Sequence, residues 1–140
     1  MKHMLSLLLA AALLQGCASH RPTGRECMDN FSTSGGIWMG KTFRSFATLP
    51  KNDEKAFESS YKELIRQGFQ VKSNDPDNLT LVAEQPVPGG DRKATLTLLI
   101  EPLDKKTSRL TLVFSVLSGM YAPESTTQTE FCNFVDAASR

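Results

Sequence analysis

The feature that most constrains the fold of this chain is the alternation of apolar and polar side chains over residues 95–117, in two runs separated by Asp104-Lys105-Lys106-Thr107. One face of the pattern carries Leu96, Leu98, Ile100, Leu110, Leu112, Phe114 and Val116, and the other carries Thr95, Thr97, Leu99, Thr111, Val113, Ser115 and Leu117. A period of two places successive side chains on opposite faces of a strand. Because one face is fully apolar and the other mixed, we expect an antiparallel sheet that helices cover on one side.

Two amphipathic helices are expected to provide that cover. The first should begin after Asn52, which suits an N-cap, and end at Gly68. Its apolar stripe consists of Phe57, Tyr61, Leu64 and Ile65. The second lies near the C-terminus, where Ser125 and Gln128 have the spacing of a capping box. Its stripe consists of Phe131, Phe134, Val135 and Ala138.

Further strands are predicted over Ile37–Leu49, Phe69–Ser73 and Leu79–Glu84, the last two joined by a turn around Pro76. The resulting order is β-α-β-β-β-β-α. We therefore predict an α+β two-layer sandwich, in which an antiparallel sheet of about five strands carries two helices on one face.

The N-terminus carries a targeting pattern. Lys2 precedes an apolar run from Met4 to Leu14, which ends in Leu14-Gln15-Gly16-Cys17. This stretch resembles the lipobox of bacterial lipoproteins, and the resemblance implies a signal peptide over residues 1–16, cleavage before Cys17 and acylation of that residue, as with palmitate. The run is shorter than the roughly 20 residues of a membrane span. The alternative is a buried N-terminal helix.

The same resemblance predicts a location. Ala18 lacks the aspartate that retains lipoproteins of this kind in the inner membrane, so we expect a lipid anchor at the periplasmic face of the outer membrane. Without Lys2 the mature chain has 15 basic and 15 acidic residues, which disfavours a nucleic-acid partner. Residues 17–36 are expected to form a lipidated tether and irregular arm, and residues 37–140 a single domain.

The remaining cysteines form a pair. If Cys17 carries lipid, Cys27 and Cys132 are left, and an oxidising periplasm favours a disulfide between them. A redox-active or metal-binding thiol pair is the alternative, but it lacks Cys-x-x-Cys spacing and a companion histidine. We expect neither a metal nor a cofactor.

Catalytic motifs are not found in the sequence. His3 belongs to the predicted signal peptide and His20 to the tether, and no nucleophile elbow, Walker loop or zinc-protease spacing is present. Asp75 with Asp77, and Glu101 with Asp104, lie in predicted turns, where carboxylates usually bond local amides. We therefore expect that the protein is not an enzyme.

Binding is the remaining class of function. Candidate recognition residues are Trp38, Met39, Met120 and Tyr121 at element ends, and Thr95, Thr97, Thr111 and Val113 on the mixed sheet face. For the first four, burial as lids of the core is the preferred expectation. The mixed face would be a flat platform for another protein if no helix covers it.

The order of elements is similar to that of the helix-grip domains of BamC-type lipoproteins, which implies a role in envelope assembly. The first functional hypothesis is accordingly a protein-binding envelope accessory module. The alternatives are a carrier of a small apolar or lipid-like ligand, with a cavity between the sheet and the helix of Phe57, and an inhibitor or immunity lipoprotein.

Overall fold

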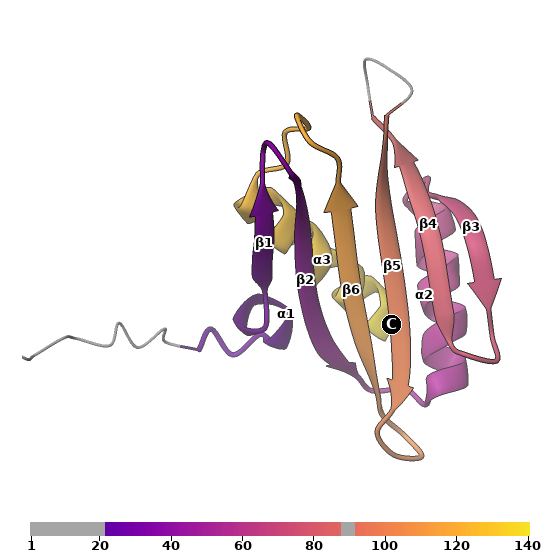
Figure 1. Ribbon diagram of the computed structural model, residues 1–140. Coiled ribbons are helices and arrows are strands. Elements are labelled where there is room, and N and C mark those ends of the chain that lie inside the picture. Colours follow the sequence, from indigo (N-terminus) through magenta and orange to yellow (C-terminus); the bar gives the residue numbers. More distant parts are fainter. Residues whose placement is uncertain (1–21, 88–91) are drawn as a thin grey trace, which may run out of the picture.

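The computed structural model describes residues 22–87 and 92–140, which form one antiparallel sheet of six strands and three helices (Figure 1). The elements are α1 (Glu26–Asp29), β1 (Ser32–Gly36), β2 (Gly40–Leu49), α2 (Asp53–Arg66), β3 (Gln70–Asp75), β4 (Thr80–Pro86), β5 (Lys93–Pro102), β6 (Ser108–Val116) and α3 (Glu124–Ser139). The strand order in the sheet is β1-β2-β6-β5-β4-β3.

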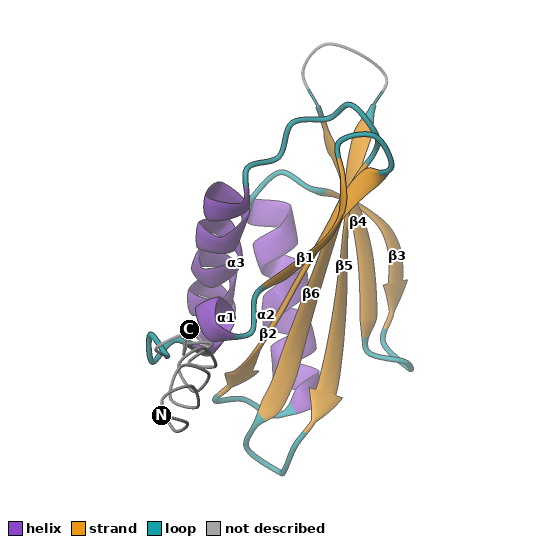
Figure 2. Ribbon diagram, turned by 60° about the vertical axis from the view of Figure 1, so that its left-hand side comes forward, coloured by secondary structure: helices purple, strands orange, loops and turns teal. Residues whose placement is uncertain are grey.

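The helices lie on one side of the sheet, and no described element covers its other face (Figure 2). Burial alternates along the central strands, as the sequence pattern predicts: in β5, Leu96, Leu98 and Ile100 are buried, whereas Leu99 is exposed. Phe134 of α3 is likewise buried. The α+β two-layer sandwich with helices on one face is therefore confirmed.

The ends of α2 also match the prediction. The Asn52 side chain accepts a hydrogen bond from the Lys55 amide at 3.1 Å, which satisfies one of the free N–H groups of the first turn. At the other end Gly68 has a φ of 80°, and the Phe69 amide donates to the Leu64 carbonyl at 3.0 Å. This left-handed turn is the usual way for a glycine to end a helix.

The predicted capping box of α3 is wrong. The helix begins one residue before Ser125, and Pro123 is its N-cap. The Gln128 side chain instead donates to the Met28 carbonyl at 3.2 Å. A contact with α1, which sequence spacing could not reveal, therefore takes the place of the local one.

The N-terminal segment also differs from expectation. Residues 22–36 belong to the predicted irregular arm, but they contain α1 and β1. Strand β1 pairs with β2 from Ser32↔Arg44 to Gly36↔Gly40. The strand predicted over Ile37–Leu49 begins only at Gly40, because residues 37–39 form the turn between β1 and β2. The proposed signal peptide and Cys17 lie outside the described residues.

A disulfide joins α1 to α3. Cys27 and Cys132 lie 105 residues apart in sequence, their Cα atoms are 5.3 Å apart, and both are buried. The Ser45 hydroxyl donates to the Cys27 carbonyl at 2.6 Å, so α1 is also bonded to β2. This corner therefore holds together the first helix, the sheet and the last helix.

Replacing both cysteines (Cys27→Ala/Cys132→Ala) should lower the free energy of unfolding by about 2–4 kcal/mol, since the bridge restricts the unfolded chain. Urea denaturation with and without reductant measures the change. Reductant should destabilise the wild type to the level of the variant and leave the variant unaffected. A wild type whose midpoint is insensitive to reductant would contradict the role given to the bridge.

Candidate functional site

A cavity of about 600 Å³ lies between the sheet and α3. Its walls are apolar: Ala94, Leu96, Leu112, Phe114 and Val116 from β5 and β6; Phe131 and Phe134 from α3; and Phe69, Val87, Met120, Ala122 and Pro123 from connecting segments. The sheet residues come from the alternating face that the helices cover. The cavity is therefore part of the space between the two layers that side chains do not fill.

The position of the cavity follows from how the two long helices meet. Near the C-terminus of α3, the Ser59 hydroxyl and the Lys51 ammonium group both donate to the Ala138 carbonyl at 2.9 Å. At the opposite ends of the helices, Gln67 just after α2 and Thr127 in the first turns of α3 both line the cavity. The helices are thus joined at one end and enclose the cavity at the other.

Polar side chains lie at the rim of the cavity. The exposed polar lining residues are Gln67, Gln85, Tyr121, Thr126 and Glu130. Among these, Gln67 already donates a hydrogen bond to Glu63 at 2.9 Å. Tyr121 and Glu130 are the lining residues of ionisable type in the described part of the chain. The buried Thr127 hydroxyl donates to the Pro123 carbonyl at 3.0 Å. The cavity thus combines an apolar interior with a polar mouth.

The sequence-based location of a cavity beside Phe57 is wrong. Phe57 packs against the core from α2 and does not line the cavity. The cavity faces α3 instead, and Phe131 and Phe134 of the predicted apolar stripe form its helical wall. The spacing of the stripe predicts which face of α3 points towards the sheet. Whether side chains fill the space between that face and the sheet depends on tertiary packing.

The four residues at element ends divide into two groups. Met120 is buried and lines the cavity, as expected for a lid. Trp38, Met39 and Tyr121 are 90%, 91% and 87% exposed, so the expectation that they are buried is wrong. The turn at residues 37–39 extends beyond the paired strands, which leaves its side chains without a layer to pack on.

The other candidate residues lie together on the uncovered sheet face. Thr97 pairs with Val113, and Thr111 pairs with Leu99 across β5 and β6. Thr95 is one strand position further along the same face. These residues share one side of the sheet, which we call the open face. Thr111 is only 9% exposed there, between Phe46 of β2 and Leu99 of β5, so the expectation that it is a recognition residue is wrong.

An ion cluster borders the open face. Glu84 of β4 lies 3.0 Å from Lys93 and 3.6 Å from Lys72. Hydrogen bonding from Lys93, with further attraction from both lysines, holds the pKa of the Glu84 carboxyl below its ordinary value. Glu84 therefore stays ionised at neutral pH and is a partner for lysines rather than a proton donor.

One carboxylate of each candidate catalytic pair stabilises a turn. Asp75 accepts bonds from the amide and side chain of Asn78, and Asp104 accepts from the Lys106 and Thr107 amides. These bonds lower both pKa values.

Within residues 22–87 and 92–140, no group of three or more metal-ligating side chains is present. No helix in these ranges has the length and apolar character needed to cross a membrane.

Comparisons with known proteins define the fold. No family model matches the chain, and no curated protein matches it by sequence. The di-domain ARO/CYC protein BexL of the BE-7585A biosynthetic pathway superposes with a TM-score of 0.54 at 9% identity, over 70% of this chain and 45% of that protein. Ara h 8.0201 gives 0.50 at 12% identity, over 77% and 96%. Norcoclaurine synthase from Thalictrum flavum is more distant, at 0.43 and 7% identity, over 90% and 98%. The architecture is thus of the helix-grip type.

The expectation that the protein is not an enzyme requires correction. The same two-layer architecture occurs in BexL, an ARO/CYC protein of a biosynthetic pathway, and the chain spans less than half of that protein's length. The expectation of no enzymatic activity rested on the absence of catalytic motifs whose residues have a fixed spacing in the sequence. An enzyme that works through the shape of an interlayer cavity need not carry such a motif.

Asp104→Asn should reduce the loss of stability on acidification. Because hydrogen bonds lower the folded-state pKa of Asp104 from its ordinary 3.8, the charged form stabilises the fold above that value, and this contribution is lost as the pH falls through the folded-state pKa. Thermal unfolding between pH 7 and pH 2 measures the effect. The variant should be less stable than the wild type at pH 7, and the difference should shrink as the pH falls. Parallel curves would contradict this role.

Proposed function

We propose that this protein binds a small apolar or lipid-like molecule in the cavity between α3 and strands β5 and β6. The observation that carries the proposal is the cavity itself. Its volume of about 600 Å³ lies within the range of about 300–1,000 Å³ that is usual for small-molecule sites. Most of its lining side chains are aliphatic or aromatic, and its exposed polar ones can remain in water at the mouth, so an apolar ligand would bury surface against the interior wall at little polar cost.

The distribution of polarity favours a ligand with a polar end. Gln85, Thr126 and Glu130 lie at the mouth, whereas Leu96, Leu112 and Phe134 line the interior. An amphipathic molecule could place its apolar part between the layers and its polar end among these exposed groups. A reaction on a bound molecule is compatible with this architecture, which the ARO/CYC protein BexL shares.

The setting that we propose is the periplasmic face of the outer membrane. Leu14-Gln15-Gly16-Cys17 supports a lipid anchor at Cys17. The pairing of Cys27 with Cys132 fits an oxidising compartment, where disulfides persist. A lipid-like ligand would be abundant in such an envelope.

A second candidate function is supported by the open face. No described helix covers the side of the sheet that carries Thr95, Thr97, Thr111 and Val113. Flat surfaces of mixed polarity resemble those of non-obligate protein interfaces. An envelope accessory module, or an inhibitor or immunity lipoprotein, would use this face rather than the cavity.

Ala94→Phe should weaken the binding of a fluorescent fatty acid at least tenfold, because the added ring occupies the cavity. Thr95→Phe is the matched control: it places the same side chain one residue later, on the open face, and should leave affinity unchanged. Thermal unfolding verifies that both variants fold. Absence of saturable binding by the wild type, or equal affinity in the two variants, would refute the cavity as the ligand site.

Cys17→Ala should transfer the protein from the membrane fraction to the periplasmic fraction in cells. Removing the thiol removes the acceptor of the acyl chains that hold the protein on the bilayer. Fractionation followed by detection of the chain measures the change. Retention of the variant in the membrane fraction would contradict anchoring through Cys17.

A further inference from the structure

Exposed apolar side chains gather at one end of the sheet. Nine large hydrophobic side chains are exposed in the described part of the chain, and five of these belong to two short segments, the β1–β2 turn and the segment after β6. We call these five the apolar tip: Ile37, Trp38, Met39, Leu117 and Tyr121. Concentrated exposure of this kind usually marks an interaction site.

The two segments of the apolar tip are joined to each other. The Gly119 amide donates to the Ile37 carbonyl at 2.7 Å, and Lys41 of β2 pairs with Val116 at the end of β6. The turn has a defined shape: a Cβ on Gly35, whose φ is +80°, would lie 2.2 Å from the Gly40 carbonyl oxygen. The apolar side chains are therefore held out by an ordered backbone.

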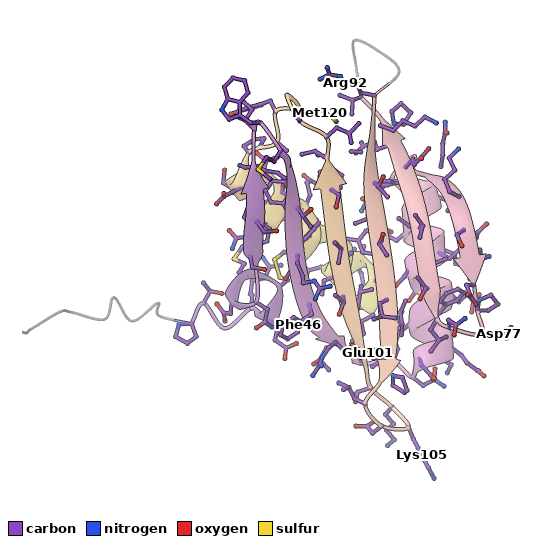
Figure 3. All side chains as sticks on the ribbon, viewed as in Figure 1. Phe46, Asp77, Arg92, Glu101, Lys105 and Met120 are labelled. Atoms are coloured by element: carbon purple, nitrogen blue, oxygen red, sulfur yellow. A yellow bond between two sulfur atoms is a disulfide. The ribbon has the colours of Figure 1, made fainter. Side chains whose placement is uncertain are left out.

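The apolar tip continues into the mouth of the cavity. Tyr121 belongs to both, and Met120 before it lines the cavity wall. Figure 3 shows Met120 and Arg92 at this end of the sheet, with Lys105 at the opposite end. A molecule leaving the cavity past Tyr121 would therefore emerge beside the tip.

The composition of the apolar tip suits a lipid surface. Tryptophan and tyrosine prefer the boundary between headgroups and acyl chains, and isoleucine, leucine and methionine suit the layer beneath. Arg92 flanks the tip and donates to the Ser118 carbonyl at 3.4 Å; Lys41 also lies there, but the Glu124 carboxylate, 3.7 Å from its ammonium group, offsets its charge. Cations in this position favour anionic headgroups.

The size of the apolar tip argues against a stable protein interface. A standard interface uses about 20–30 residues on each side, whereas the tip offers five side chains on two narrow turns. A hairpin end is a convex shape that can enter a bilayer. The open face is the broader surface.

We propose that the apolar tip inserts into the surface of a lipid bilayer and places the mouth of the cavity against it, so that a lipid-like ligand passes between bilayer and cavity. The passage of ligand depends on the proposed function, whereas insertion of the tip does not. The two can therefore be tested separately.

Insertion can be measured on the chain itself, because Trp38 is its single tryptophan. We would use residues 17–140 with Cys17→Ser, which removes the acyl acceptor, and vesicles of phosphatidylglycerol and phosphatidylcholine. Trp38 emission should shift to shorter wavelength and be quenched by brominated acyl chains. An unchanged emission spectrum would overturn the proposal, and a shift that appears on concentrating the protein without vesicles would assign the tip to a second copy.

Variants separate insertion from ligand binding. Met39→Ser/Tyr121→Ser should weaken vesicle binding at least tenfold, whereas Leu103→Ser, an exposed leucine in the β5–β6 turn, should not. Met39→Ser alone should leave fatty-acid affinity in solution unchanged while slowing transfer of the probe to vesicles. Equal vesicle binding by the tip and Leu103 variants would overturn insertion; failure of the wild type to bind the probe would overturn the proposed function and leave the Trp38 result standing.

Discussion

Burial of one face of the sheet is the constraint on which the other features depend. The alternating residues of β5 and β6 require a covering layer, and α2 and α3 supply it. These helices share hydrogen bonds at Ala138, near the end of α3, but at their other ends they border the cavity. The cavity is thus a consequence of covering a wide, twisted sheet with two helices that are fixed together at one end.

The sequence predicts the elements whose periodicity reflects burial on one face. Leu96, Leu98 and Ile100 identify a strand, and Asn52 and Gly68 bound a helix, because these signals are local. The β1 strand was missed because Ser32–Gly36 contains no apolar residue, and its extended shape depends on pairing with β2. Its partner strand is correctly placed apart from its first three residues.

The candidate site was harder to predict than the fold. The exposure of a side chain, and whether side chains fill the space between the layers, depend on tertiary packing. Trp38 looks like a core residue from its type, yet the turn that carries it projects past the sheet. Likewise, Phe131 and Phe134 could fill a core or line a cavity with the same spacing. Enzymatic activity is difficult to predict for the same reason, because catalysis within a shaped cavity need not appear as a sequence motif.

The strand order has a consequence for how the chain reaches this structure. Within the sheet, β2 (Gly40–Leu49) pairs with β6 (Ser108–Val116), and the disulfide joins cysteines 105 residues apart. The pairs β3–β4, β4–β5 and β5–β6 are hairpins of consecutive strands, which can form first. Strand β2 can pair with β6 only after the residues between them have been synthesised. Topologies of this kind fold slowly, since long loops must close before contacts compensate. The contacts that close the fold, β2 with β6 and Cys27 with Cys132, therefore depend on nearly the whole described chain being present, so a truncation of α3 before Cys132 would remove the disulfide as well as part of the covering layer.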